Sequence, residues 1–193
     1  MAQNPNKPSI PPEAKKVFQG DRWAIWQWQQ RMNDGSTQTF ETPERADGVS
    51  AIAINKDKKI ALLTQIQVPS PDTFFCFPGG EVDPGETPEQ ACKRELLEEA
   101  GCKAGTLEFW KSYYPSSRLA YGFHYFIARD CEVVAPLSPD PGEQITVSWI
   151  TFDEMFQLAL EPKFRHDDFT RDLMGMMLHP EKKEVFRRLL FGV

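Results

Sequence analysis

Long apolar runs are scarce in this chain of 193 residues, and none approaches the roughly 18 residues that a membrane-spanning helix needs. The first 16 residues also lack the apolar middle of a secretory signal peptide. Both absences argue against a membrane or secreted protein. We therefore expect a soluble protein of the cytoplasm that has no membrane partner.

Positive charge is also in deficit, with 22 Lys and Arg against 28 Asp and Glu and a formal net charge of −6 at pH 7. Proteins bind the phosphates of nucleic acids through clusters of Lys and Arg. We therefore expect a small-molecule substrate and no nucleic-acid partner.

Cysteine and histidine are too few and too dispersed to predict a zinc site. The four cysteines are Cys76, Cys92, Cys102 and Cys131; none lies in a C-x-x-C pair, and the chain has only three histidines. We interpret the cysteines as free buried thiols in a reducing compartment.

Three segments differ in composition. Residues 1–16 are rich in proline and poor in apolar side chains, which indicates a flexible arm. Residues 17–45 alternate aromatic and polar residues around Asp34-Gly35, a pair that favours a tight turn, so they predict a small antiparallel β unit. Its tryptophans need a surface to cover, on the main domain or on a second subunit. Residues 46–193 form the main domain.

Short β segments run through the main domain, at residues 49–54, 59–68, 74–80, 107–114, 121–128 and 145–150. A strongly helical segment, 88–100, separates the third from the fourth. Residues 152–160 predict a second helix, and residues 167–190 predict one or two more, interrupted at Pro180. This mixture predicts an α/β (α+β) sandwich with C-terminal helices.

The helix at 88–100 has strong local signals at both ends. Thr87 is a good N-cap, and Gln90 completes a capping box with it. Pro88 occupies the first helical position, where its missing N–H costs nothing. Gly101 supplies the left-handed residue that ends the helix.

Three acidic side chains gather on one face of this helix. At about 100° per residue, Glu95, Glu98 and Glu99 fall within an arc of about 100°. An apolar stripe lies beside them, formed by Cys92, Leu96 and Ala100. Like charges at this spacing repel, so a cation is expected among them. Hard oxygen ligands suit Mg²⁺ or Mn²⁺.

A solvated glutamate face with salt bridges is the alternative, since Glu89 can pair with Lys93 and Arg94 with Glu98. The preceding loop decides between the two. The string Gly80-x5-Glu86-x7-Arg94-Glu95-Leu96-x-Glu98-Glu99-x-Gly101-Cys102 resembles the Nudix box, the loop-helix-loop signature of the Nudix hydrolases. Cys102 departs from the pattern, because a bulky aliphatic residue is usual there.

The resemblance implies a Nudix-type α/β/α sandwich with a mixed sheet. It also implies that Glu95 and Glu99 are principal metal ligands, that Glu98 contributes directly or through water, and that the carbonyl of Gly79 completes the site. Glu86 and Arg94 resemble the family's structural pair, which positions the loop against the helix and so affects catalysis through geometry.

A general base is still needed, because a diphosphate is anionic and repels an attacking water. In several Nudix hydrolases the base is a glutamate on a loop well downstream of the box. Here the acidic turn before residues 145–150 offers Glu143. The alternatives are that Glu143 is an ordinary turn residue and that Glu98 is the base.

The N-terminal β unit and Pro115 resemble the ADP-ribose pyrophosphatase group, whose members are commonly homodimers in which N-terminal strands help form the partner's site. This implies Mg²⁺-dependent cleavage of a nucleoside diphosphate sugar to a nucleoside monophosphate and a sugar phosphate. One segment dissents: Leu63-Thr64-Gln65-Ile66-Gln67 lies where that group carries Arg-Gln-aromatic-Arg, and neither arginine is present. Another nucleoside diphosphate sugar or derivative is therefore an alternative to ADP-ribose.

Other interpretations remain open. A catalytically silent Nudix domain could sense a nucleotide, although it would not require three glutamates. A Nudix-fold isomerase of a prenyl diphosphate would need a nucleophile such as Cys76. His124 could face the site or be a satisfied strand histidine. The residues Trp23, Trp26 and Trp28 could stack on a nucleobase, but packing is the stronger hypothesis.

Overall fold

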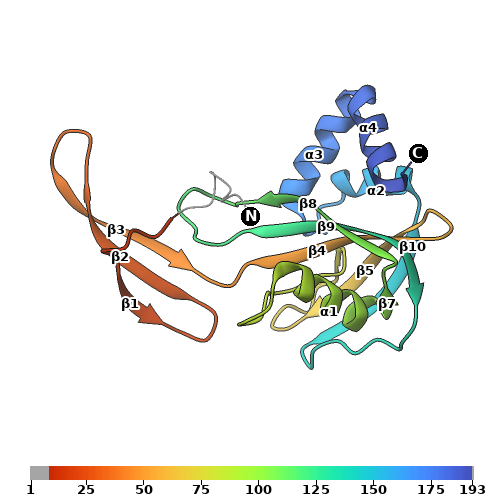
Figure 1. The fold of residues 1–193 in the computed structure, drawn as a ribbon, viewed down its shortest axis with the longest axis horizontal. Helices are drawn as coiled ribbons and strands as arrows, with labels where there is room; N and C mark the ends of the chain where they lie inside the picture. The colour runs from red at the N-terminus through yellow and green to blue at the C-terminus, as the bar shows by residue number, and fades with distance from the viewer. Residues whose placement is uncertain (1–8, 193) are drawn as a thin grey trace.

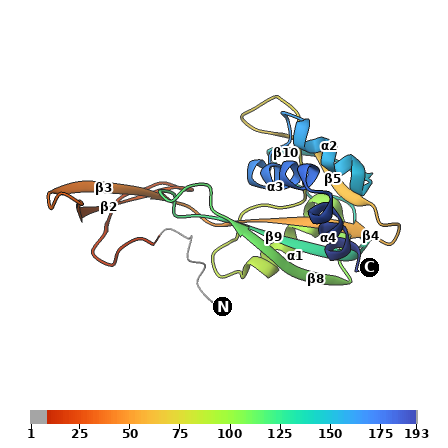
Figure 2. The same cartoon turned by 90° about the horizontal axis from the view of Figure 1, so that it is seen from above.

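The computed structural model describes residues 9–192, so residues 1–8 of the predicted arm lie outside the described part. A larger α+β body carries a small three-stranded sheet that projects from one side (Figures 1 and 2). Within residues 9–192, no helix is both long and apolar enough to cross a membrane.

A seven-stranded mixed sheet forms the centre of the body. Its strands are β4 (Gly48–Asn55), β5 (Ile60–Gln67), β6 (Phe74–Cys76), β7 (Cys102–Lys103), β8 (Thr106–Tyr113), β9 (Phe123–Val133) and β10 (Glu143–Ile150). The order is β10-β5-β4-β9-β7, with β6 paired to β5 and β8 to β9. Only the β4–β9 pair is parallel among these strands, so the predicted mixed sheet is confirmed.

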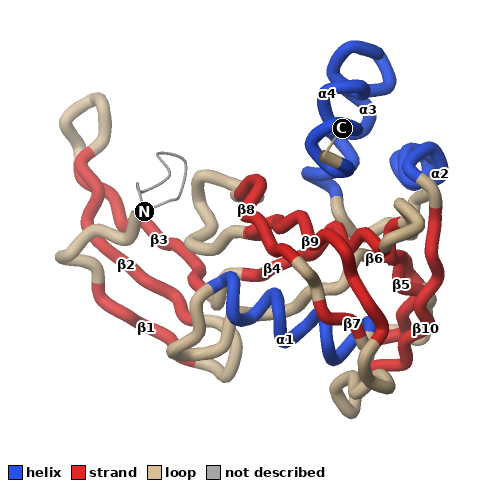
Figure 3. Tube along the Cα trace, turned by 45° about the vertical axis from the view of Figure 1, so that its right-hand side comes forward, coloured by secondary structure: helices blue, strands red, loops and turns tan. Residues whose placement is uncertain are grey.

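Helices cover both faces of this sheet (Figure 3). Helix α1 (Pro88–Ala100) lies on one face, while α2 (Phe152–Gln157), the 3₁₀ turn η1 (Leu158–Leu160), α3 (Asp167–Leu178) and α4 (Pro180–Phe191) lie on the other. Strand β4 has apolar side chains on both faces, which explains why both are covered. Ala51 and Ala53 pack in the core cluster with Leu96 of α1. Ile52 and Ile54 point the other way, into the cluster with α2 to α4. A strand buried on both faces is the centre of a sandwich.

The N-terminal β unit is a three-stranded antiparallel sheet of β1 (Lys15–Gln19), β2 (Ala24–Arg31) and β3 (Thr37–Glu44). Gly35, at φ 85°, makes the predicted β2–β3 turn. Strand β1 begins at Lys15, so its first two residues belong to the segment predicted as a flexible arm. All five β1 residues are exposed, which leaves no alternation for a sequence pattern to reveal.

The N-terminal sheet meets the body at the loop between β8 and β9. The backbone N–H of Ala120 donates to the carbonyl of Pro43 at 2.9 Å. Trp23 packs edge-on against Tyr121, with 5.6 Å between ring centroids. The guanidinium of Arg45 lies 4.9 Å from the Tyr121 ring centre. These tryptophan and arginine contacts fix the direction in which the sheet leaves the body.

Gly101 sets the end of α1, and its substitution tests that role. Its φ is 63°, and an added Cβ would lie 2.3 Å from the carbonyl oxygen of Ala135. We expect Gly101→Ala to lower the free energy of unfolding by more than about 1 kcal/mol. Gly175 within α3 is the matched control, because an added Cβ would meet nothing within 4 Å. Gly175→Ala should stabilise by about 0.4–1 kcal/mol. Urea denaturation measures both, and equal effects would contradict this assignment.

Candidate active site

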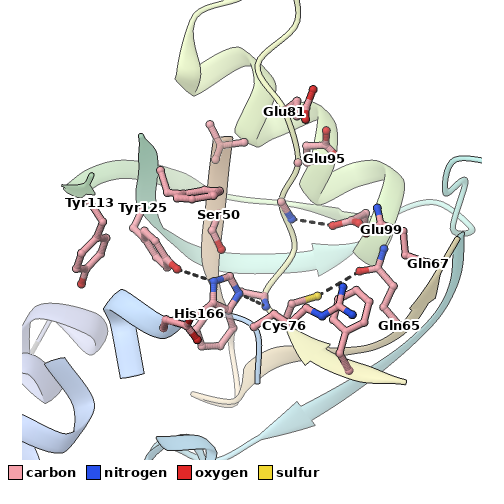
Figure 4. A pocket seen from close by; sticks show the side chains of 18 of the residues that line it. Ser50, Gln65, Gln67, Cys76, Glu81, Glu95, Glu99, Tyr113, Tyr125 and His166 are labelled. Atoms are coloured by element: carbon pink, nitrogen blue, oxygen red, sulfur yellow. Dashed lines mark hydrogen bonds between the residues drawn. The ribbon is translucent and has the colours of Figure 1, made fainter. Parts of the chain in front are cut away.

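A cavity of about 1160 Å³ opens where the loop before α1 meets the sheet edge formed by β5 and β6. Figure 4 shows side chains of this cavity. Six of the residues predicted for the site lie on its wall, namely Gly79, Arg94, Glu95, Glu98, Glu99 and Glu143. Glu86 does not line the cavity.

Helix α1 presents the acidic residues as its sequence predicted. The Thr87 hydroxyl accepts from the Gln90 backbone N–H at 3.2 Å, and the Gln90 side chain accepts from the Thr87 backbone N–H at 2.8 Å. This capping box is confirmed, and so are Pro88 in the first turn and the left-handed Gly101. With Leu96 buried against the sheet, the neighbouring glutamates are turned toward the cavity.

Arg94 ties the loop to the helix. Its Nε and Nη2 donate to the two carboxylate oxygens of Glu86, each at 3.0 Å, and Nη2 also donates to the carbonyl of Glu81 at 3.0 Å. Its Nη1 reaches Glu95 at 2.7 Å and Glu98 at 3.1 Å. A lysine ammonium cannot match this two-sided fork. Glu86 therefore acts on the cavity through Arg94 and through Asp83, whose backbone N–H donates to the Glu86 carboxylate at 3.2 Å.

Glu99 and Glu95 are carboxylates removed from water. Glu99 is 3% exposed, and its Oε2 accepts from the backbone N–H of Gly79 at 2.7 Å. Burial raises the pKa of Glu99 to about 9 and that of Glu95 to about 7, and the charge of Glu143 adds to both shifts. Such a cluster favours either a proton or a bound cation.

Two glycines let the loop approach these carboxylates. A Cβ on Gly79 would lie 2.1 Å from the carbonyl oxygen of Val49, and one on Gly80 would lie 2.2 Å from Oε1 of Glu95. The carbonyls of Pro78 and Gly80 accept from β4. The Gly79 N–H instead faces Glu99, and in extended backbone the carbonyl of the same residue points to that side. The Gly79 carbonyl accepts no hydrogen bond from residues 9–192.

Glu143 joins this cluster from the opposite side of the cavity. It is the first residue of β10, where it pairs with Gln67 of β5, and it was expected on a loop before the strand. Gln67 Nε2 donates to its carboxylate at 2.8 Å. An amide thus holds the Glu143 carboxylate in place, and no cation among the described residues pairs with it.

An uncharged polar wall was missed by the sequence analysis. His166 Nε2 accepts from the backbone N–H of Phe77 at 2.9 Å, and burial lowers the pKa of His166 to about 3, so the ring is neutral. Its Nδ1 therefore carries the proton and donates to the Tyr125 hydroxyl, which leaves the hydrogen of that hydroxyl available. The buried Ser50 hydroxyl nearby has no partner within the described chain (Figure 4). No motif marks these residues, because tertiary packing brings them together from distant parts of the chain.

Several weaker candidates are unsuited to a role in the chemistry by their position or their environment. His124 bonds to Ser112 at 2.7 Å and Asp47 at 3.1 Å and does not line the cavity, so it is a satisfied strand histidine. Trp23, Trp26 and Trp28 do not line it either. The four cysteines are free and buried, as predicted. Burial also raises the pKa of Cys76, whose thiol donates to Gln65, which makes it a poor nucleophile.

The donor set fits a hard divalent cation. The carboxylates of Glu95 and Glu99 and the free carbonyl of Gly79 are oxygen donors on one wall. Across residues 9–192, no three His, Cys, Asp or Glu side chains are already close enough together to hold a metal ion. Arg94 supplies positive charge among these carboxylates, since its guanidinium bridges Glu95 and Glu98.

The raised pKa values predict how stability depends on pH. A carboxylate whose pKa is higher in the folded state stabilises the fold below its unfolded pKa, and this is lost as pH rises through the folded pKa. With values of about 7 for Glu95 and about 9 for Glu99, metal-free protein should lose stability between pH 5 and 9. Urea denaturation in EDTA at pH 5 and at pH 9 measures this loss. In the Glu99→Gln variant the difference in the free energy of unfolding between the two pH values should be smaller by at least about 1 kcal/mol. Glu89→Gln, on the exposed face of α1, should leave the slope unchanged.

Comparisons with known proteins agree with this geometry. The NUDIX domain model matches residues 44–173, more than half of the chain. An ADP-ribose pyrophosphatase of Bacillus subtilis (strain 168) is 25% identical over 147 residues, which cover 75% of this chain and 80% of that protein. An 8-oxo-dGTP diphosphatase of Haemophilus influenzae is 49% identical over 51 residues, 25% of this chain and 38% of that protein.

Among solved structures, a crystal structure of an ADP compounds hydrolase shares the fold, with a TM-score of 0.69 and 22% identity over 92% of this chain and 97% of that one. The family match spans the sheet, the acidic helix and the start of α3. The chain therefore belongs to the Nudix hydrolase family, in which it is most similar to the ADP-ribose pyrophosphatase subgroup.

Proposed function

We propose that this Nudix hydrolase cleaves the diphosphate linkage of a nucleoside diphosphate sugar similar to ADP-ribose, and that it requires Mg²⁺. The products are a nucleoside monophosphate and a sugar phosphate. The observation that carries this proposal is the convergence of Glu95, Glu99 and Glu143 on one cavity of about 1160 Å³. That volume suits a ligand of this size, and the relative from B. subtilis supports the substrate class.

The residues that would hold Mg²⁺, or Mn²⁺ in its place, are Glu95, Glu99 and the carbonyl of Gly79, with Glu98 contributing directly or through water. When bound, the cation supplies charge neutralisation at the diphosphate and a lower pKa for the attacking water. The protein contributes the rigid frame: Arg94 and Glu86 keep the loop against α1, and the Gly79 N–H keeps the Glu99 carboxylate in one orientation.

Glu143 is the residue that we assign as the general base. Water attacks one phosphorus atom, the bond from that phosphorus to the bridging oxygen breaks, and the water proton passes to the Glu143 carboxylate. Gln67 orients this carboxylate without neutralising it. Glu98 is the second candidate, because it lines the same cavity and its carboxylate is held only by Arg94.

Two other functions are less well supported. A silent nucleotide sensor has no need of a buried Glu99 and a partly buried Glu95 with raised pKa values, which destabilise the fold when ionised. A prenyl diphosphate isomerase would need a reactive thiolate, and burial raises the pKa of Cys76 instead. Phosphate release from ADP-ribose, other nucleotide sugars, dinucleoside polyphosphates and nucleoside triphosphates, after phosphatase treatment and with or without Mg²⁺, separates these functions.

The N-terminal sheet leads us to propose a homodimer. It projects from the body, and Val17 and Phe18 on it are 51% and 55% exposed. Arg22, in the loop after β1, reaches the wall of the cavity, so the sheet and the site are close.

Glu95→Gln and Glu99→Gln should each lower kcat by orders of magnitude and leave the fold intact. Each removes ligand charge at constant side-chain volume, and a glutamine at 99 can still accept from the Gly79 N–H. Steady-state kinetics and circular dichroism measure the two effects. Glu89→Gln is the control, since Glu89 pairs with Lys93 on the exposed side of the same helix. A folded Glu95→Gln or Glu99→Gln variant with near wild-type turnover would refute the metal assignment.

Glu143→Gln should lower kcat by about 10²–10⁴ while KM stays within a few-fold, and it should flatten the acid limb of the pH–rate profile. Rescue by higher Mg²⁺ or by Mn²⁺ would instead mark Glu143 as a metal ligand, because added cation offsets lost affinity and cannot replace a base. If the variant is as active as wild type, Glu143 has neither role.

Light scattering should give about twice the mass of one chain at micromolar concentration. Phe18→Asp should shift the protein toward monomer, because it places a charge on the exposed sheet. Val185→Asp is the matched control, since Val185 is 65% exposed on α4 of the body, away from that sheet. A wild-type monomer at all micromolar concentrations would exclude the dimer.

A further inference from the structure

Four chain segments lie side by side at one edge of the seven-stranded sheet. Strand β10 pairs with β5, and β5 pairs with β6. Residues 163–165 continue the sheet beyond β6, because the Phe75 N–H donates to the carbonyl of Lys163 and the Arg165 N–H donates to the carbonyl of Phe75, each at 2.9 Å. The bridge between Phe75 and Phe164 is parallel.

This register places a row of side chains on the face that looks into the cavity. Glu143 is opposite Gln67, Gln65 is two residues away on the same strand, and Phe74 is opposite Gln65. Because Phe164 is opposite Phe75, Arg165 falls on the same face as Phe74. The row therefore runs from the carboxylate of Glu143 across two uncharged amides to the guanidinium of Arg165, and every member lines the cavity.

Arg165 is held in a way that keeps its donors available. Its guanidinium carbon lies 3.6 Å from the centre of the Phe74 ring. Stacking uses the flat face of the guanidinium and leaves its N–H groups free at the edge. The next residue, His166, is bonded through both ring nitrogens, which anchors the backbone that carries Arg165.

Arg165 has no ion pair and no side-chain hydrogen bond with any of residues 9–192. The other arginines of the cavity wall on the body are paired: Arg94 with Glu86, Arg45 with Glu81 at 3.5 Å and Arg171 with Asp168 at 3.2 Å. Arg22 is also unpaired in the described chain, but it comes from the N-terminal sheet and not from this face. An unpaired guanidinium on the wall of a cavity is a candidate binding group for an anionic ligand.

We propose that Arg165 binds the phosphate oxygens of the substrate diphosphate. This inference rests on the proposed function. On this face β5 itself carries only the uncharged side chains of Gln65 and Gln67. Arg165 brings a positive charge to this face from the loop before α3. Its planar fork matches two phosphate oxygens, whereas a lysine would offer a point charge.

The test uses imidodiphosphate, whose bridging nitrogen resists hydrolysis, so that binding is measured apart from turnover. Titration calorimetry in Mg²⁺ should show that Arg165→Ala weakens binding about ten-fold or more, and that Arg165→Lys restores part of the loss. Arg171→Ala is the matched control, because Arg171 lines the same cavity but is paired and its side chain is 79% exposed. It should change the Kd less than two-fold.

Kinetics with the nucleotide sugar that wild type hydrolyses should show the same rank order in KM, with kcat within a few-fold. A folded Arg165→Ala variant that binds imidodiphosphate as wild type does, or a wild-type protein that does not bind it, would overturn the assignment. Failure of the proposed function has a different outcome: wild type would hydrolyse no nucleotide sugar, while the imidodiphosphate titration would still decide the role of Arg165.

Discussion

The fork between Arg94 and Glu86 is the contact on which the geometry of the site depends. It clamps the loop of residues 80–87 to α1, and the remaining guanidinium donors reach Glu95 and Glu98. The loop can lie this close because Gly79 and Gly80 have no side chains. Once the loop is fixed, the Gly79 N–H meets the Glu99 carboxylate, and the free carbonyl of Gly79 turns to the same side. The Arg94 guanidinium thus positions the oxygen atoms that are proposed to bind a divalent cation.

Holding the acidic cluster together lowers the stability of the fold, and apolar burial in the α/β/α sandwich offsets this cost. Burial of Glu95 and Glu99 raises both pKa values, so ionised protein without a cation carries a penalty. The two core clusters on opposite sides of β4 supply the offsetting apolar burial. Because the glutamates sit on a helix whose apolar stripe is fixed in one of these clusters, they cannot move apart to relieve the repulsion. A divalent cation bound there, as proposed, would relieve the repulsion, and metal binding would then be linked to the stability of the fold.

The parts of the site that the sequence predicts are those set by local rules. Thr87, Gln90, Pro88 and Gly101 define α1 from within a short stretch, and the spacing of the glutamates follows from the helical repeat. The cysteines also match their prediction, since all four are buried and free. What could not be predicted depends on pairings between distant segments. His166 and Tyr125 meet through tertiary packing, and Arg165 reaches the cavity only because residues 163–165 add to β6. Strand β1 was missed because its exposed residues show no period.

The same register gives a physical reason for a neutral residue at position 67 of β5. An arginine at position 67 would lie directly opposite Glu143 and form an ion pair with it. Such a pair would stabilise the charged carboxylate and make it a weaker base. Gln67 orients Glu143 through a neutral hydrogen bond at 2.8 Å and leaves its charge uncompensated. Arg165 lies at the other end of the row, so the proposed phosphate-binding group and the proposed base are separated by the uncharged residues, and neither neutralises the other.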